Sequence, residues 1–120
     1  MSFKGEEMKL NTFKSLSRHR FKVCFNLMCG TKNKEYSRND DKLHNFKCAG
    51  RMLDILPEYA LLGMFSKHMV SIIDIVDDIP DLPNYSLLEE KITDAINYLV
   101  LLEALVKERI DHRMDNTKAS

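Results

Sequence analysis

Two long segments with helical periodicity, separated by a short proline-containing connector, constrain this chain more than any other feature. The connector spans residues 79–84 and contains Pro80 and Pro83. Proline fixes φ and disfavours helix in the residue before it, so the connector cannot be helical. Apolar residues recur at helical spacing on both sides of it. We therefore expect one helix to end near Asp78 and another to begin near Ser86.

The outer ends of these two helices also have recognisable signals. Pro57 suits the first turn of a helix, where the missing N–H needs no partner. Ser86 and Glu89 have the spacing of a capping box, in which each side chain bonds the other residue's backbone N–H. The second helix is expected to continue to about Arg113. No β-alternation of useful length and no internal repeat occurs.

The N-terminal half predicts shorter elements. A first helix is expected from Thr12, a candidate N-cap, to Gly30, a candidate C-cap, with a break near Ser17 left open because the apolar spacing falters there. Residues 31–42 are almost entirely polar and predict a loop. A short helix with apolar residues from Phe46 to Leu56 should follow.

These elements predict an all-α fold, a bundle of about four helices with two long C-terminal ones. A chain of 120 residues is expected to form one domain. We expect a loose arm over 1–11, a helical domain over 12–113 and a frayed tail over 114–120. So short a chain buries only about two-thirds of its unfolded surface. If its helices are apolar on several sides, a homodimer or higher homo-oligomer would cover them.

Charge and cysteine content narrow the functional classes. Lys+Arg and Asp+Glu both number 18, and this balance argues against a nucleic-acid-binding domain, which normally has a basic excess. The locally basic run over 14–22 predicts a solvated helix face, with a phosphate-binding patch as the alternative. Three cysteines without a CxxC pair predict reduced thiols. With no signal-peptide core and no run of about 18 apolar residues, we expect a cytoplasmic protein without a membrane span.

Polar residues on the last helix form the first candidate site. At 100° per residue, one face collects the apolar residues of an ordinary core stripe: Leu88, Ile92, Ala95, Ile96, Leu99, Leu102, Val106 and Ile110. The opposite face is also apolar, with Leu87, Tyr98, Leu101 and Leu105. Glu90, Asp94 and Asn97 lie among these residues at helical spacing. Glu90 and Asp94 share a face, so they are candidate oxygen ligands for Mg²⁺, and otherwise they are solvated or paired acids.

The preceding helix has a narrow polar stripe beside a broad apolar face that runs from Leu61 to Val76. The stripe comprises Lys67, Ser71, Asp74 and Asp78, at spacings of four, three and four residues. His68 lies on an apolar flank, where a histidine is more often a satisfied core residue than a ligand. The loop over 32–46 adds candidate lid residues, in which Tyr36 would stack on a base, Lys34 would contact phosphate and Asn45 would hydrogen-bond. A polar surface loop is the alternative.

Taken in order, these motifs resemble a known family. They are Lys32-Asn33-Lys34-Glu35-Tyr36, Asp40-Asp41, Asn45-Phe46, Lys67-His68-Met69-Val70-Ser71-Ile72 and Glu90…Asp94-Ala95-Ile96-Asn97-Tyr98. The pattern covers about residues 22–107 and is similar to the largely phage-borne, nucleotide-modification-associated helical proteins. These are related to the MazG-like all-α nucleoside triphosphate pyrophosphatases.

The resemblance implies a Mg²⁺-dependent activity in which acids on two helices hold the metal and a positioned water releases pyrophosphate from a nucleoside triphosphate. By that resemblance Glu90 and Asp94 are metal ligands, and Asn97 and Tyr98 match the polar-aromatic pair that follows them and are candidate nucleotide contacts. Asp74, the nearest acid on the other helix, is a further candidate metal ligand. This chain departs from the enzymes in one respect. Their paired-glutamate motif is replaced by Lys67-His68, and the second motif is Glu-x-x-x-Asp rather than Glu-x-x-Asp.

Three hypotheses follow from the sequence. The first is a Mg²⁺-dependent pyrophosphohydrolase of phage or bacterial nucleotide metabolism, with Lys67 and His68 on phosphate and Glu90 and Asp94 on the metal. The second is a non-catalytic protein that sequesters a nucleotide or signalling molecule, which suits the missing glutamates. The third is a structural helical interaction module whose polar residues fix the register of a dimer.

Overall fold

The computed structural model describes residues 7–30, 41–79 and 84–119 of the chain. It contains four helices: α1 (Leu10–Cys29), α2 (His44–Leu53), α3 (Pro57–Asp77) and α4 (Tyr85–Ala119). No β-strand occurs in the described ranges, so the predicted all-α class is confirmed. The two long helices lie where the apolar spacing places them: α3 ends at Asp77 and α4 begins at Tyr85, and residues 80–83 of the predicted connector lie outside the described residues.

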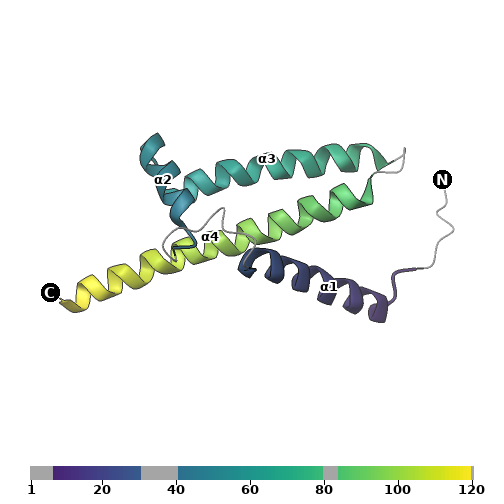
Figure 1. The fold of residues 1–120 in the computed structure, drawn as a ribbon, viewed down its shortest axis with the longest axis horizontal. Coiled ribbons are helices and arrows are strands. Elements are labelled where there is room, and N and C mark those ends of the chain that lie inside the picture. Colours follow the sequence, from purple (N-terminus) through teal and green to yellow (C-terminus); the bar gives the residue numbers. More distant parts are fainter. Residues whose placement is uncertain (1–6, 31–40, 80–83, 120) are drawn as a thin grey trace.

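Helix α4 is the axis of the molecule. Helix α3 runs antiparallel beside it, α1 lies on another side of it, and α2 crosses the start of α3 (Figure 1). The C-terminal part of α4 extends beyond the other three helices. As a result the molecule is elongated, with extents of 65 × 31 × 27 Å.

The cap at the start of α4 differs from the prediction. The side-chain oxygen of Asn84 accepts a hydrogen bond from the backbone N–H of Leu87 (3.2 Å), and the helix begins at Tyr85. Ser86 therefore lies within the first turn, so the predicted capping box with Glu89 is wrong. An asparagine N-cap satisfies a first-turn N–H group in the way expected of the serine, two residues earlier in the chain.

The turn between α2 and α3 is tight. Helix α2 ends at Leu53, and Asp54 adopts a left-handed conformation with φ of 56°. The N–H of Ile55 then donates to the carbonyl oxygen of Gly50 (2.9 Å), and Pro57 begins α3 as predicted. The left-handed residue ends α2 three residues earlier than the predicted limit at Leu56.

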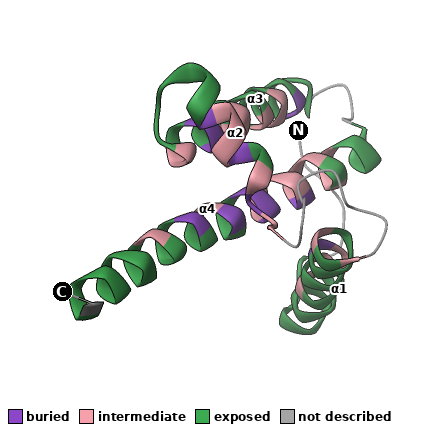
Figure 2. Cartoon of the chain, turned by 60° about the vertical axis from the view of Figure 1, so that its left-hand side comes forward, coloured by how far each residue is buried: buried purple, intermediate pink, exposed green. Residues whose placement is uncertain are grey.

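The first and last helices are longer than predicted. Helix α1 begins at Leu10, inside the expected arm, and continues without a break through Ser17, whose hydroxyl donates to the Phe13 carbonyl of the preceding turn. Helix α4 continues to Ala119, so the expected frayed tail is helical. Most of α1 and the C-terminal half of α4 are exposed (Figure 2).

The core lies where α2, α3 and α4 meet. Its buried cluster consists of Leu43, Phe46, Leu61, Tyr98, Leu101 and Leu105. The buried face of α4 is therefore the one that was expected to lie opposite the core. No residue of the predicted core stripe is fully buried: its N-terminal part is half-buried, whereas Leu99, Val106 and Ile110 are exposed, with exposed fractions of 52% for Leu99 and 51% for Ile110. Helical periodicity identifies both apolar faces of α4 but contains nothing that decides which one meets α3.

Helix α3 is unusually apolar and only partly covered. Among the described residues, α3 is the one helix that is long enough and apolar enough to cross a membrane, judged by length and composition alone; its mean hydropathy is 1.3. The core helix of a soluble protein can meet the same criteria, but such a helix is mostly buried. Here 17% of the window is buried, and Val70, Ile73 and Val76 are exposed.

Candidate functional site

The predicted site residues on α3 and α4 fall into two groups. His68 faces α4, where its Nδ1 lies 3.7 Å from Oδ2 of Asp94 and its ring centroid lies 4.9 Å from that of Tyr98. Asn97 is buried on the same helix as Asp94. The structure therefore brings together one residue of α3 and three of α4.

The other predicted residues of α3 lie outside this cluster. Lys67 and Asp74 are exposed, and the Ser71 hydroxyl donates to the backbone carbonyl of Lys67 within its own helix (3.2 Å). Among the described residues no group of three or more His, Cys, Asp or Glu side chains could hold a metal ion. Asp74 thus does not join Glu90 and Asp94 in a three-acid site.

The remaining predicted residues belong to the loop and to α2. Tyr36 and Lys34 lie outside the described residues. Asn45 is an exposed residue in the first turn of α2. Of the predicted lid over 32–46, the described residues comprise 41–46, where the Asp41 carboxylate pairs with Lys47 and Phe46 is buried in the core.

Tyr98 is a core residue rather than a surface for stacking a base. It is 9% exposed, and its ring packs edge-on against Phe46 and Phe65 at centroid distances of 6.3 and 6.5 Å. This packing holds the ring beside His68 and leaves little of its face accessible. The predicted nucleotide contact by Tyr98 does not fit this position.

Asp94 lies in a poorly solvated position. Burial raises the pKa of its carboxyl group; His68 opposes this effect, and Glu90, one helical turn away, adds to it. A raised pKa means that the ionised carboxylate lacks compensating charge in the folded protein. A cation placed beside Asp94 would supply that charge.

Two buried polar atoms in the same cluster have no hydrogen-bond partner. They are Nδ1 of His68 and Oδ1 of Asn97. Buried polar groups in native proteins are usually paired, because an unpaired one retains its desolvation cost. Together with the raised pKa of Asp94, they mark the α3–α4 contact as chemically unsatisfied.

On another side of α4 a groove separates it from α1. The guanidinium of Arg20 donates to the Glu89 carboxylate (2.6 Å) and to the Thr93 hydroxyl (2.9 Å), and this bridge joins the two helices. The groove has a volume of about 300 Å³. Its walls are His19, Arg20, Val23, Leu27, Glu89, Glu90, Thr93 and Asp94. Asp94 thus lines the groove and also approaches His68.

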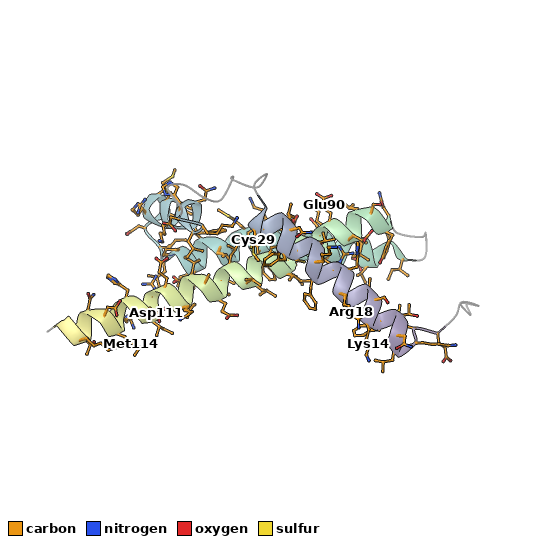
Figure 3. All side chains as sticks on the ribbon, turned by 60° about the horizontal axis from the view of Figure 1, so that its bottom comes forward. Lys14, Arg18, Cys29, Glu90, Asp111 and Met114 are labelled. Atoms are coloured by element: carbon orange, nitrogen blue, oxygen red, sulfur yellow. The ribbon has the colours of Figure 1, made fainter. Side chains whose placement is uncertain are left out.

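Arg20 is not among the predicted site residues, because it was grouped with the solvated basic run. Lys14, Arg18 and Lys22 are indeed exposed, as predicted for that run; Figure 3 shows Lys14 and Arg18 on α1 and Glu90 on α4. Arg20 differs, with a side chain only 11% exposed. A signal exists in the sequence, since Arg20 shares a helical face with Leu16, Cys24 and Leu27.

Cys24 completes the contact between α1 and α4. It is 4% exposed, its Sγ lies 3.9 Å from the Thr93 carbonyl oxygen, and burial raises the pKa of its thiol. The thiol therefore stays protonated and acts as a packing residue. This agrees with the prediction of a reduced cysteine.

Comparisons of the chain with family models, with curated proteins and with solved structures found no match. The function is therefore inferred from the residues of the α3–α4 contact and of the groove between α1 and α4.

Proposed function

We propose that the protein binds a nucleotide in the groove between α1 and α4, with one divalent cation on Glu90 and Asp94. The observation that carries the proposal is the composition of that groove, which His19 and Arg20 of a basic helix line together with Glu90 and Asp94 of α4. Phosphate requires cationic donors, and Mg²⁺ requires oxygen ligands, so one groove offers both.

The chemistry of Asp94 supports the cation. Its ionised form is disfavoured by burial, and Glu90 on the same helix disfavours it further. A divalent ion between these carboxylates would offset both effects. Two protein ligands are few for Mg²⁺, but this ion commonly takes its remaining ligands from substrate phosphates and water. When bound, the ion would neutralise phosphate charge.

Binding without turnover is the form that the geometry favours. In the described residues, α3 places His68 near Asp94. None of its acids there forms a metal-binding group with Glu90 and Asp94. The paired acids that the resemblance implies for the other helix are thus missing from the cluster. Sequestration of a nucleotide requires only the cationic and metal contacts.

Hydrolysis of a nucleoside triphosphate to release pyrophosphate is the second candidate. It is favoured by the 3.7 Å approach of His68 to Asp94, since an imidazole oriented by a carboxylate is a common general base. Pyrophosphate release from nucleoside triphosphates with Mg²⁺ would establish it. Loss of that release in His68→Gln, with nucleotide affinity retained, would assign the role to His68.

Titration calorimetry with a panel of nucleoside mono-, di- and triphosphates, with and without Mg²⁺, tests the binding proposal. We expect the heat of binding to require Mg²⁺ and to be lost in Asp94→Asn. Asp115→Asn is the matched control, because Asp115 is an exposed acid on the same helix. The absence of heat with every nucleotide would refute nucleotide binding.

The cationic side of the groove has its own pair of variants. Arg20→Gln should weaken binding at least tenfold, whereas Arg18→Gln, an exposed arginine two residues away, should leave it unchanged. Because Arg20 also joins α1 to α4, circular dichroism must show that the variant stays helical. Equal weakening by both variants would indicate general charge attraction rather than a site in the groove.

A further inference from the structure

The face of α4 that points away from the buried Leu101 and Leu105 carries an apolar stripe. We define it as Leu99, Leu102, Val106 and Ile110. Leu102 is half-buried, and the other three are 41–52% exposed. Four large apolar side chains along three turns are a large exposed patch for a monomer.

The chain as a whole exposes far more surface than a compact monomer. Its accessible area is 9563 Å², whereas a monomer of 14.0 kDa is expected to expose about 6,700 Å². Its radius of gyration is 18.3 Å, against roughly 14 Å for a compact domain of this length. A standard interface needs only about 800 Å² from each partner, so the excess is ample for one.

We propose that this stripe packs against the same stripe of a second copy of the chain, with the two α4 helices antiparallel. The two-fold axis would pass near position 105. The apolar residues of one copy at 99, 102, 106 and 110 then lie level with positions 111, 108, 104 and 100 of the other. The two rows therefore interleave, as ridges of one helix do in the grooves of another.

Charge complementarity favours this register. Glu103 and Lys107 lie on the same flank of the stripe, and each is two residues from position 105. In an antiparallel pair the same flanks of the two helices meet. Glu103 of each copy is therefore level with Lys107 of the other, and the axis generates this ion pair twice.

The same charges favour a second copy over a lipid surface. Glu103, Lys107 and Asp111 border the stripe, and Lys107 already pairs with Asp111 at 2.9 Å. A membrane would have to desolvate both signs of charge, whereas a helix pair leaves them at a solvated rim. The chain also has a formal net charge of zero, so two copies do not repel each other.

Sedimentation equilibrium on the full chain measures the association. We expect a mass twice the 14.0 kDa of one chain. Val106→Glu should weaken self-association at least tenfold. Val70→Glu is the matched control, because Val70 is an exposed valine on α3 outside the stripe and should leave the mass unchanged.

Mixing two charge variants tests the register. Glu103→Lys alone would set lysines opposite lysines, and Lys107→Glu alone would set glutamates opposite glutamates, so each should be mainly monomeric. An equimolar mixture should form heterodimers, since every cross-copy pair is then of opposite charge. An effect inside a single helix cannot produce rescue on mixing.

Several results would overturn the proposal. A wild-type chain that is monomeric at about 100 µM would do so, because a dimer with a micromolar dissociation constant is populated at that concentration. This holds whether or not the chain floats with phosphatidylcholine vesicles. Equal dissociation by Val70→Glu and Val106→Glu would place the interface elsewhere. Failure of the mixture to associate, while the wild type does, would exclude the stated register.

Discussion

At the residue scale, the α3–α4 contact is a packed site with unmet polar groups. Tyr98 packs in the aromatic core. His68, whose ring lies beside that of Tyr98, and Asn97, which precedes Tyr98 in the sequence, each have one buried polar atom without a hydrogen-bond partner. Asp94 has a raised pKa in the same place. Such groups reduce stability unless a ligand or cation satisfies them, so their cost should be measurable in the unliganded protein.

Replacing Asn97 with leucine removes one unmet group. Because Oδ1 of Asn97 is buried without a partner, we expect Asn97→Leu to leave the free energy of unfolding in urea unchanged or to raise it by about 1 kcal/mol. Asn116→Leu, an exposed position on α4, should change it by less than about 0.5 kcal/mol. A loss of more than about 1 kcal/mol in Asn97→Leu would mean that the amide is satisfied in solution.

Asp94 should make stability depend on pH. Burial raises the pKa of its carboxyl in the folded state above the ordinary 3.8 of the unfolded state. At a pH between 3.8 and the raised pKa, the folded state therefore binds more protons than the unfolded state. Stability from this group therefore falls as pH rises above 3.8 through the raised pKa. The free energy of unfolding of Asp94→Asn minus that of the wild type should increase over this range.

At the scale of elements, helix positions follow largely from the sequence and helix ends do so less well. Pro57 begins α3 as predicted, because proline suits a first turn. Asn84 rather than Ser86 caps α4, since two candidate caps lie two residues apart and only the backbone geometry chooses between them. The left-handed residue that ends α2 is Asp54 rather than a glycine, so the sequence has no glycine signal for this helix end.

Two glycines on adjacent helices should respond oppositely to alanine. A Cβ at Gly50 would lie 2.8 Å from the Ile55 carbonyl oxygen and 3.1 Å from the Pro57 nitrogen, both backbone atoms, so Gly50→Ala should destabilise by more than about 1 kcal/mol. A Cβ at Gly63 would meet no atom within 4 Å apart from its chain neighbours and the backbone of its own helix. Gly63→Ala should stabilise α3 by about 0.5–1 kcal/mol in thermal or urea unfolding. The same sign for both variants would contradict the close packing of the α2–α3 turn.

At the scale of the whole molecule, the small core and the long exposed helices support the proposed self-association. Phe13, Phe21 and Phe25 of α1 are all more than half exposed, in addition to the α4 stripe. A monomer with this distribution gains little from burial, whereas self-association adds to the stability of the folded state by mass action.

The thermal midpoint should therefore rise with protein concentration. Between about 5 and 200 µM the wild-type midpoint is expected to increase, because only the folded chain associates. Val106→Glu should melt at a midpoint independent of concentration, whereas Val70→Glu should retain the dependence. A concentration-independent wild-type midpoint would contradict self-association. Differential scanning calorimetry measures all three.

The sequence by itself determines the helical class, the connector with Pro80 and Pro83, and the two apolar faces of α4, because these depend on local geometry and spacing. It also identifies Asp94, His68 and Asn97 as residues of interest. Only the tertiary structure decides which face of α4 is buried, that Arg20 joins α1 to α4, and that Tyr98 belongs to the core. These depend on contacts between residues distant in sequence, about which helical periodicity contains no information.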